Sequence, residues 1–132
     1  MAEKIKIAKR LCAQGFRTLL LALCGSLPAT AASVDLKAFA DCISASGAKY
    51  YAAYWCPYCK KQNAMFDKDW VFLPYVECSA RPGRKQLSRC SHIDGYPTWI
   101  FADGTRRSSV LSYQQLESYT GCKLEENNRF ID

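Results

Sequence analysis

The chain has 132 residues, of which 49% are hydrophobic and 13% aromatic, so it is long enough for one packed domain and too short for two. Of its formal net charge of +6, the first 17 residues contribute +4, through Glu3 and five basic residues: Lys4, Lys6, Lys9, Arg10 and Arg17. Only +2 remains for the rest of the chain, so nucleic-acid binding has no electrostatic basis.

Residues 1–32 predict a secretory signal peptide. Basic residues up to Arg17 are followed by a short apolar run over 18–24 and then by small residues, which is the order of a signal sequence and its cleavage site. The alternative is an N-terminal membrane anchor, but the apolar run is shorter than the ~20 residues that span a bilayer. We therefore expect cleavage after Ala31 or Ala32 and export to the periplasm or an equivalent oxidising lumen.

Removal of the signal peptide would leave an even number of cysteines: Cys42, Cys56, Cys59, Cys78, Cys90 and Cys122. Because disulfide bonds persist in oxidising compartments, an even cysteine count in an exported domain predicts that they pair. If Cys56 pairs with Cys59, three pairings of the other four cysteines remain.

In chain order, the first half of the mature chain predicts a helix, a strand, a second helix and a second strand. Ser33 can cap the first helix, whose apolar residues follow helical spacing and which Gly47 ends. An aromatic-rich strand follows over Lys49–Trp55. Pro57 then suits the first turn of a helix, where its missing N–H costs nothing. The next strand is expected over Val71–Cys78, bent at its proline.

After this strand comes a loop, Arg81–Arg89, that opens into a short helix. The loop carries four positive charges: Arg81, Arg84, Lys85 and Arg89. A run of like charge is usually a solvated surface, and we favour that interpretation here. The alternative is a docking patch for an acidic partner.

The second half of the chain predicts a hairpin and a final helix. Asp103-Gly104 is a strong turn signal between a strand over Thr98–Ala102 and a second strand over Thr105–Leu111. Ser112 then begins the pattern of a capping box, and Gly121 ends the helix that follows it.

This order of elements predicts an α/β fold with a small mixed sheet flanked by helices. Strands that alternate with helices favour parallel pairing, and the Asp-Gly hairpin adds an antiparallel edge. We expect one domain over residues 33–122, followed by a polar tail over 123–132 that frays.

The strongest functional motif is W-C-P-Y-C, residues 55–59, at the end of a predicted strand and the start of a helix. Two cysteines at this spacing can close a small disulfide ring. The first sulfur also lies over unpaired helix N–H groups, which favour the thiolate that attacks disulfides. We therefore expect Cys56 to be the exposed nucleophile and Cys59, one turn inside the helix, to resolve or re-form the mixed disulfide.

Three features together resemble the thioredoxin superfamily: the W-C-x-x-C motif after a strand, the order of elements, and the sequence G-Y-P-T at residues 95–98. The resemblance implies a thioredoxin-like fold and a protein-disulfide oxidoreductase without a cofactor or metal. It also implies that Pro97 is cis and lies against the cysteine pair, where neighbouring backbone groups hold the substrate. The substrate-binding residues expected on this basis are Trp55, Tyr58, Tyr96 and Pro97.

Three longer stretches are similar to the thioredoxin-like domain of bacterial and plant vitamin K epoxide reductase homologues: residues 51–59, 73–78 and 95–100. In that family the domain exchanges disulfides with a quinone-coupled membrane partner. The sequence holds no multi-helix membrane portion, so we expect a free-standing monomer that acts on protein thiols and has its membrane partner on a separate polypeptide. The resemblance further implies a local Cys78–Cys90 bridge and a Cys42–Cys122 bridge that joins the ends of the domain.

Two positions near the motif bear on its redox potential. Tyr58 lies between the cysteines where strongly oxidising relatives often carry histidine, so we expect an intermediate potential. Tyr50 stands six residues before Cys56, where many thioredoxins carry a buried acid, and this argues against a thioredoxin-type reductant. The motif alone does not determine the direction of electron flow, because oxidases, isomerases and reductases all use it.

Four other interpretations remain open. One of the structural cysteine pairs could relay electrons to Cys56 and Cys59. Cys56 and Cys59 could instead belong to a zinc site, but the sequence has no second C-x-x-C to complete it, and its one histidine, His92, is more typical of an ordinary loop residue. The C-P-Y-C sequence also suits a secreted glutaredoxin-like protein, although the preceding tryptophan opposes this. A non-catalytic, disulfide-stapled binding module would contain no reactive thiolate.

Overall fold

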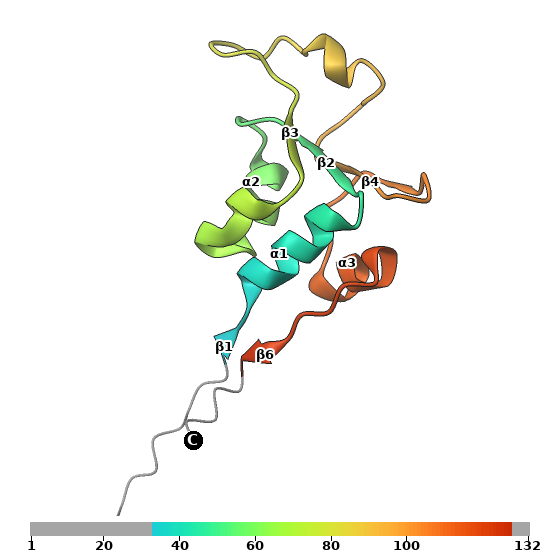
Figure 1. Cartoon of the computed structure of the whole chain (residues 1–132). Helices are drawn as coiled ribbons and strands as arrows, with labels where there is room; N and C mark the ends of the chain where they lie inside the picture. The colour runs from blue at the N-terminus through green and yellow to red at the C-terminus, as the bar shows by residue number, and fades with distance from the viewer. Residues whose placement is uncertain (1–32, 128–132) are drawn as a thin grey trace, which may run out of the picture. The chain divides into compact units, whose positions relative to one another are not determined.

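The computed structural model describes residues 33–127; the predicted signal peptide, residues 1–32, and the end of the predicted tail, residues 128–132, lie outside the described part (Figure 1). The described helices are α1 (Leu36–Ala45), α2 (Pro57–Ala64) and α3 (Tyr113–Thr120), with two short 3-10 helices, η1 (Asp67–Phe72) and η2 (Ser88–Cys90). The described strands are β1 (Ser33–Val34), β2 (Lys49–Ala52), β3 (Tyr75–Glu77), β4 (Thr98–Ile100), β5 (Arg106–Arg107) and β6 (Glu126–Asn127).

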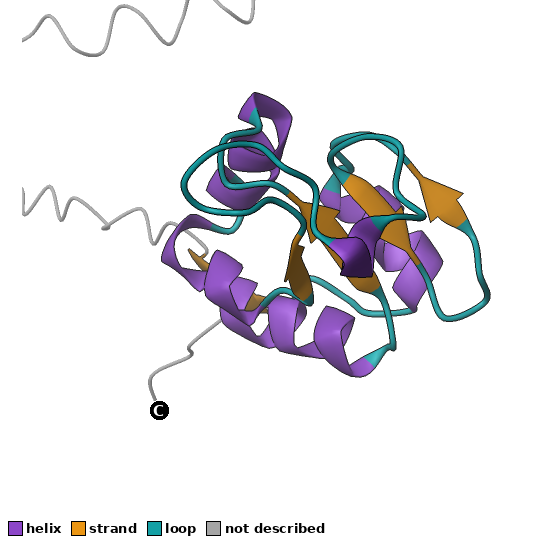
Figure 2. Cartoon of the chain, turned by 90° about the horizontal axis from the view of Figure 1, so that it is seen from above, coloured by secondary structure: helices purple, strands orange, loops and turns teal. Residues whose placement is uncertain are grey.

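Strands β2 to β5 form a four-stranded sheet in the order β3-β2-β4-β5. Strand β2 pairs in parallel with β3 and antiparallel with β4, and β4 pairs antiparallel with β5. With helices around this small mixed sheet, the predicted thioredoxin-like α/β fold is confirmed (Figure 2). The predicted parallel pairing holds only between β2 and β3. Between β3 and β4 there is a loop with the short η2 instead of a full helix, and the chain returns in the opposite direction.

The main core is built around the two central strands. Tyr50 on β2 pairs in register with Trp99 on β4, and their rings stack with centroids 4.5 Å apart. Phe39 of α1 and Leu116 of α3 belong to the same buried cluster. Burial of these large apolar side chains is the dominant favourable contribution to folding, and it fixes the helices on the sheet.

A second, smaller cluster consists of the buried residues Cys78, Cys90 and Ile93. It packs against Tyr51 of β2, the neighbour of Tyr50. Successive side chains of a strand point to opposite faces, so the two clusters lie on opposite sides of β2. The smaller cluster anchors the loop between β3 and β4.

Helix α1 begins later than predicted. Its N-cap is Asp35, whose side chain accepts a hydrogen bond from the Ala38 N–H at 2.9 Å, rather than Ser33. Ser33 instead pairs with Asn127 in the ladder of β1 and β6, which holds it in an extended conformation. The tail is predicted to fray from residue 123, and this prediction is wrong for the part up to Asn127, because β6 pairs with β1 there. Strand β6 therefore lies beyond residue 122, the predicted end of the domain.

Strands β2 and β3 are shorter than predicted. Strand β2 ends at Ala52 because the Cys56 N–H donates to the Ala53 carbonyl at 3.0 Å, which turns the chain towards α2. Strand β3 begins only at Tyr75 because η1 occupies the residues up to Phe72. The early end of β2 places the cysteine motif beyond the edge of the sheet.

Strand β5 is also shorter than predicted and ends at Arg107. The backbone of Leu111 leaves the sheet to bond with the side chain of the buried Gln62 on α2. Its N–H donates to Gln62 Oε1 at 2.7 Å, and its carbonyl accepts from Gln62 Nε2 at 3.1 Å. Two hydrogen bonds to a buried amide replace the strand pairing expected there.

The local turn and cap signals are confirmed. The Asp-Gly turn is formed with Gly104 at φ +84°, and Gly121 ends α3 in the left-handed region at φ +74°. The Ser112 side chain accepts the Gln115 N–H at 3.2 Å, and the Gln115 side chain accepts the Ser112 N–H at 2.9 Å. These are the reciprocal hydrogen bonds of a capping box.

Candidate active site

The first cysteine of the motif is the N-cap of α2. Cys56 adopts an extended conformation, and Pro57 follows it in the first turn of the helix. The Cys59 N–H donates to Cys56 Sγ at 3.2 Å. The N–H groups of a first helical turn have no partners within the helix, and they favour negative charge at this sulfur. The sulfur therefore lies where a thiolate is stabilised by backbone donors.

A second backbone group, from a distant part of the chain, contacts this sulfur. Cys56 Sγ lies 3.6 Å from the carbonyl oxygen of Tyr96, to which its thiol donates. The peptide bond between Tyr96 and Pro97 is cis, as the resemblance implied. The predicted nucleophile and the predicted proline therefore lie together, although 40 residues separate Cys56 from Tyr96 in the chain.

Both cysteines of the motif are buried. Cys56 is 3% exposed and Cys59 is 1% exposed. The expectation that Cys56 is an exposed nucleophile is wrong in this reduced form, because Trp55 and Tyr96 pack against the cluster that contains it.

Burial also changes the pKa of the second cysteine, Cys59. It raises the pKa of the Cys59 thiol to about 12, with a further contribution from the hydrogen bond to Cys56, while the backbone of Ala53 lowers it. Cys59 therefore keeps its proton at neutral pH. A pair with one buried, protonated thiol and one sulfur over helix N–H groups has the asymmetry that a resolving and an attacking cysteine require.

Tyr50 lies beneath the motif on β2. Its hydroxyl is 3.1 Å from the carbonyl oxygen of Cys59 and 2.9 Å from Oδ1 of Asn63, both on α2. Burial raises the pKa of this phenol well above its usual value, so it stays protonated and acts as a donor. Tyr50 holds the helix in place and cannot accept a proton as a buried carboxylate would.

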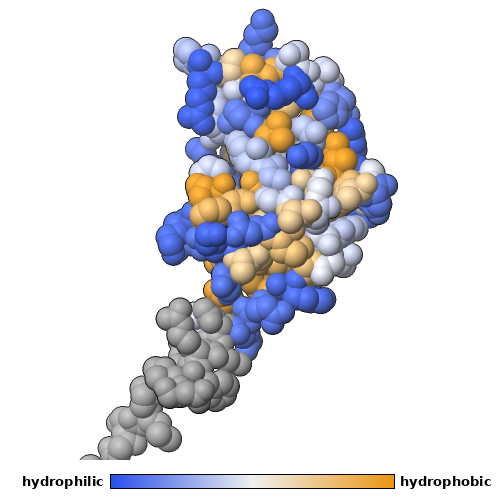
Figure 3. All heavy atoms as spheres, viewed as in Figure 1, coloured by the Kyte–Doolittle hydropathy of each residue, from blue (hydrophilic) through white to orange (hydrophobic). Residues whose placement is uncertain are grey.

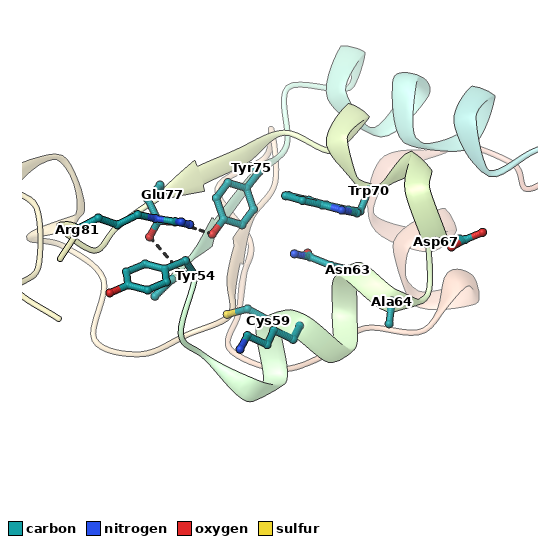
Figure 4. Close-up of a pocket in the computed structure, with 11 residues that line it drawn as sticks. Tyr54, Cys59, Asn63, Ala64, Asp67, Trp70, Tyr75, Glu77 and Arg81 are labelled. Atoms are coloured by element: carbon teal, nitrogen blue, oxygen red, sulfur yellow. Dashed lines mark hydrogen bonds and ion pairs between the residues drawn. The ribbon is translucent and has the colours of Figure 1, made fainter. Parts of the chain in front are cut away.

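A pocket of about 510 Å³ opens beside Cys59, lined by residues from α2, η1 and the end of β3 (Figure 4). Across this pocket from α2 lies the carboxylate of Glu77. Its Oε1 accepts the N–H groups of Tyr54 at 3.3 Å and Ser79 at 3.0 Å, and its Oε2 accepts the Tyr75 hydroxyl at 2.9 Å. The carboxylate therefore connects the residue just before the motif with β3 and the start of the loop that follows β3.

The sequence interpretation did not assign a role to Glu77. The available signal was an acidic residue near the end of a predicted strand, in a stretch that is otherwise apolar and aromatic. A carboxylate in such a position needs hydrogen-bond partners, and the structure supplies them from two loops. Which loops meet there depends on the strand order, and the residue type alone does not reveal it.

A second pocket, of about 390 Å³, lies on the proline side of the motif. It is lined by Tyr58, Lys61, Tyr96, Pro97 and residues 108–110. The structure thus brings together three of the four predicted substrate-binding residues, and the Tyr58 side chain extends into solvent with 64% exposure.

The fourth predicted substrate-binding residue, Trp55, does not line this pocket. It faces the loop between β3 and β4, where its Nε1–H donates to the Ser79 hydroxyl at 2.8 Å. Its ring nevertheless packs edge-to-face against that of Tyr96, with centroids 6.1 Å apart, so Trp55 contacts one of the other three predicted residues from outside the pocket.

The remaining cysteines in the described part are paired as Cys42–Cys122 and Cys78–Cys90, which are the two bridges that the resemblance implied. Their Cα atoms are 5.9 and 5.5 Å apart, within the ordinary range for disulfides. Cys56 and Cys59 are free thiols. Within residues 33–127, no three metal-ligating side chains are grouped in a way that could hold an ion.

Comparison with known proteins adds one informative similarity. The chain is 36% identical over 97 residues to the thiol-disulfide oxidoreductase LTO1 of Arabidopsis thaliana, and the match covers 69% of this chain. It covers 26% of LTO1, so the chain spans about a quarter of the length of that relative. No protein-family profile matches the chain. The similarity supports a thioredoxin-like oxidoreductase.

Proposed function

We propose that this protein is an exported thiol-disulfide oxidoreductase that exchanges a Cys56–Cys59 disulfide with protein thiols. The observation that carries the proposal is the asymmetry of the pair. Cys56 Sγ lies over the N-terminus of α2, 3.2 Å from a backbone N–H, while burial keeps Cys59 protonated. The named activity of LTO1 supports the same chemistry.

The exchange proceeds in two steps that balance. A substrate thiolate attacks Cys56 Sγ of the oxidised protein, the Cys56–Cys59 bond breaks, and Cys59 takes up a proton. A second substrate thiolate then attacks the substrate sulfur of this mixed disulfide, and Cys56 leaves as a thiolate that the Cys59 N–H stabilises. The substrate loses two electrons as its disulfide forms, and the protein gains them. The reverse sequence starts from the dithiol form that the structure describes.

Export and a membrane partner are part of the proposal. The N-terminal pattern of residues 1–32 and two structural disulfides both suit an oxidising compartment. A quinone-coupled membrane oxidoreductase would restore the redox state of Cys56 and Cys59, as the resemblance to domains of vitamin K epoxide reductase homologues implies. None of the helices in the described part is long and apolar enough to cross a bilayer.

The decisive experiment measures the redox activity of the mature protein directly. The Cys56–Cys59 pair should equilibrate with glutathione at a potential between about −120 and −270 mV, the range spanned by strong oxidants and strong reductants of this kind. Insulin reduction should depend on the same pair. A folded protein whose free thiols neither equilibrate with glutathione nor reduce insulin would refute the proposed function and favour the non-catalytic binding module.

The partner proposal has its own test. In cells of the source organism, the Cys59→Ser variant should accumulate disulfide-linked complexes through Cys56, and a membrane oxidoreductase should be among them. Protein found only in a reducing compartment would contradict export. Complexes with soluble proteins alone would contradict the membrane partner while leaving the exchange chemistry intact.

A further inference from the structure

The loop between β3 and β4 carries the four charges that the sequence left as a solvated surface. We name residues 81–89 the basic loop. In Figure 3 the surface over this part of the chain, at the top of the view, is predominantly hydrophilic. The four basic residues Arg81, Arg84, Lys85 and Arg89 are all exposed. They differ from an ordinary run of solvated charges because the loop that carries them is cross-linked and contacts residues beside the cysteine motif.

The basic loop is closed at its base. The Cys78–Cys90 disulfide joins its two ends, and Ser79 pairs with Gln86 in an isolated antiparallel bridge. Between them, the Ala80 N–H donates to the Lys85 carbonyl at 2.8 Å. A hairpin with these cross-links presents its charges in a limited set of positions.

The loop is also attached to the two residues that precede the nucleophile. The Tyr54 hydroxyl donates to the Gly83 carbonyl at 2.6 Å, and the Arg81 guanidinium lies 4.1 Å from the centre of the Tyr54 ring. The Arg84 guanidinium lies 4.7 Å from the centre of the Trp55 ring. Figure 4 shows Arg81 beside Tyr54 at the edge of the pocket next to Cys59.

A further hydrogen bond connects the loop to the proline side of the site. Gln86 Nε2 donates to the Tyr96 hydroxyl at 3.0 Å, and the Tyr96 carbonyl is the group that faces Cys56 Sγ. The basic loop thus contacts residues on both sides of the nucleophile. A substrate segment that lies across Trp55 and Tyr96 would be beside this loop.

Most of the charge on the loop is not neutralised within the described part of the chain. Arg81 lies 3.7 Å from Glu77, but Arg84, Lys85 and Arg89 form no ion pair with any residue of 33–127. A guanidinium that stacks on an aromatic ring keeps the donors on its edges free, and these match a carboxylate in a bidentate geometry.

We infer that the basic loop selects protein substrates whose reactive cysteine is flanked by acidic residues. The inference rests on the proposed exchange function and names its substrate class. Carboxylates beside the substrate cysteine would pair with Arg84 and Lys85 as its sulfur approaches Cys56. Attraction between opposite charges would also raise the rate of encounter.

The test uses three peptide disulfides of equal length, each a dimer of a peptide with one cysteine flanked by glutamate, glutamine or lysine. The reduced protein, with both structural bridges intact, reduces each dimer to two thiols and becomes oxidised at Cys56–Cys59. Each rate constant is divided by that of dithiothreitol with the same peptide, which removes the effect of flanking charge on the disulfide itself. Tryptophan fluorescence of the protein, or chromatography of quenched samples, follows the reaction.

We expect the normalised rate constants to follow the order acidic, neutral, basic, with about tenfold between acidic and neutral peptides at low ionic strength. In ~0.5 M salt the preference should fall below about twofold, because screening shortens the range of exposed charges. This salt dependence is measured on the unaltered protein, so it does not depend on whether a variant folds.

Matched variants locate the preference. Arg84→Glu/Lys85→Glu should abolish or reverse the ratio of acidic to neutral rates. Lys49→Glu/Lys68→Glu makes the same change in net charge on exposed residues of β2 and η1, and it should leave the ratio within about twofold of that of the unaltered protein. Equal rates for all three peptides, a preference insensitive to salt, or equal loss in both variants would overturn the inference.

Two further outcomes separate the alternatives. If the protein reduces none of the peptides although Cys56 and Cys59 equilibrate with glutathione, the inference is overturned and the proposed function stands; if the thiols do not equilibrate with glutathione either, both fail. Binding to vesicles that contain anionic phospholipid, lost in Arg84→Glu/Lys85→Glu, together with equal peptide rates, would assign the basic loop to a membrane surface and overturn its role in substrate selection.

Discussion

Two pairs of cysteines in this domain are equally buried and chemically different. Cys56 and Cys59 are free thiols, whereas Cys78 and Cys90 form a disulfide. None of the four is more than 3% exposed. Burial therefore does not separate a redox-active pair from a structural one.

The polar groups around the sulfur do separate them. Cys56 Sγ accepts a backbone N–H at the start of α2, where the helix favours negative charge. Cys78 Sγ lies 3.5 Å from the carbonyl oxygen of Val76, and its cluster contains the apolar Ile93. A carbonyl oxygen lies near each sulfur, since Cys56 Sγ is 3.6 Å from that of Tyr96, but of the two only Cys56 Sγ also accepts a backbone N–H. The comparison teaches that backbone donors, rather than accessibility, distinguish the exchanging sulfur.

The largest effect that tests this distinction is on exchange activity. Cys56→Ser should lower insulin reduction by at least about 10³-fold while far-UV circular dichroism stays unchanged, because the nucleophile is lost and the helix cap is retained. Cys59→Ser should instead trap mixed disulfides through Cys56, visible by mass spectrometry without reductant. Full activity in either variant would contradict the assignment.

The structural bridges should matter for stability instead. Their sequence separations are 80 for Cys42–Cys122 and 12 for Cys78–Cys90. The chain-entropy model then predicts losses of about 4 and about 3 kcal/mol when each pair is replaced by alanine, as measured by urea unfolding. Cys42→Ala/Cys122→Ala should keep insulin reduction. A loss of activity comparable to that of Cys56→Ser would show that this bridge relays electrons.

A smaller effect is expected from the residue that supports α2. Tyr50→Phe removes the hydroxyl near the Cys59 carbonyl and Asn63, which should cost about 1 kcal/mol in the free energy of unfolding. The matched control is Tyr51→Phe, since the Tyr51 hydroxyl forms no hydrogen bond within the described residues. Equal urea midpoints for the two variants would argue against a supporting role for Tyr50.

The smallest expected effect is on how the free energy of unfolding depends on pH, and it comes from the Cys59 thiol. Its pKa in the folded protein is raised to about 12, above that of an unfolded thiol, so folding favours the protonated form. The resulting stability is fully present below the unfolded pKa of about 8.5 and is lost progressively as pH rises towards 12.

The oxidised protein is the control for this effect, because Cys59 cannot titrate in a disulfide. The difference in urea stability between reduced and oxidised protein should therefore shift in favour of the oxidised form between pH 8 and pH 10.5, roughly the range above the unfolded pKa. A constant difference over that range would mean that Cys59 does not hold its proton as inferred.

Local patterns in the sequence predicted the elements that short-range chemistry decides. The order of helices and strands around the cysteine motif, Pro57 in the first turn of α2, the Asp-Gly turn and the Ser112 capping box all appear in the structure. Each depends on the conformational preferences of a few consecutive residues, and the hydrogen bonds involved span three residues or so. The motif itself is local in the same sense, because its two cysteines and the helix N-terminus are adjacent in the chain.

Tertiary structure decided what depends on residues distant in sequence. The Gln62 side chain captures Leu111, 49 residues away, and this shortens β5. The pairing of β1 with β6 moves the start of α1 to Asp35 and gives part of the tail a partner. The burial of Cys56 arises in the same way, because Tyr96 packs over it from a distant loop. Such contacts follow from packing and strand order, and no pattern of neighbouring residues encodes them.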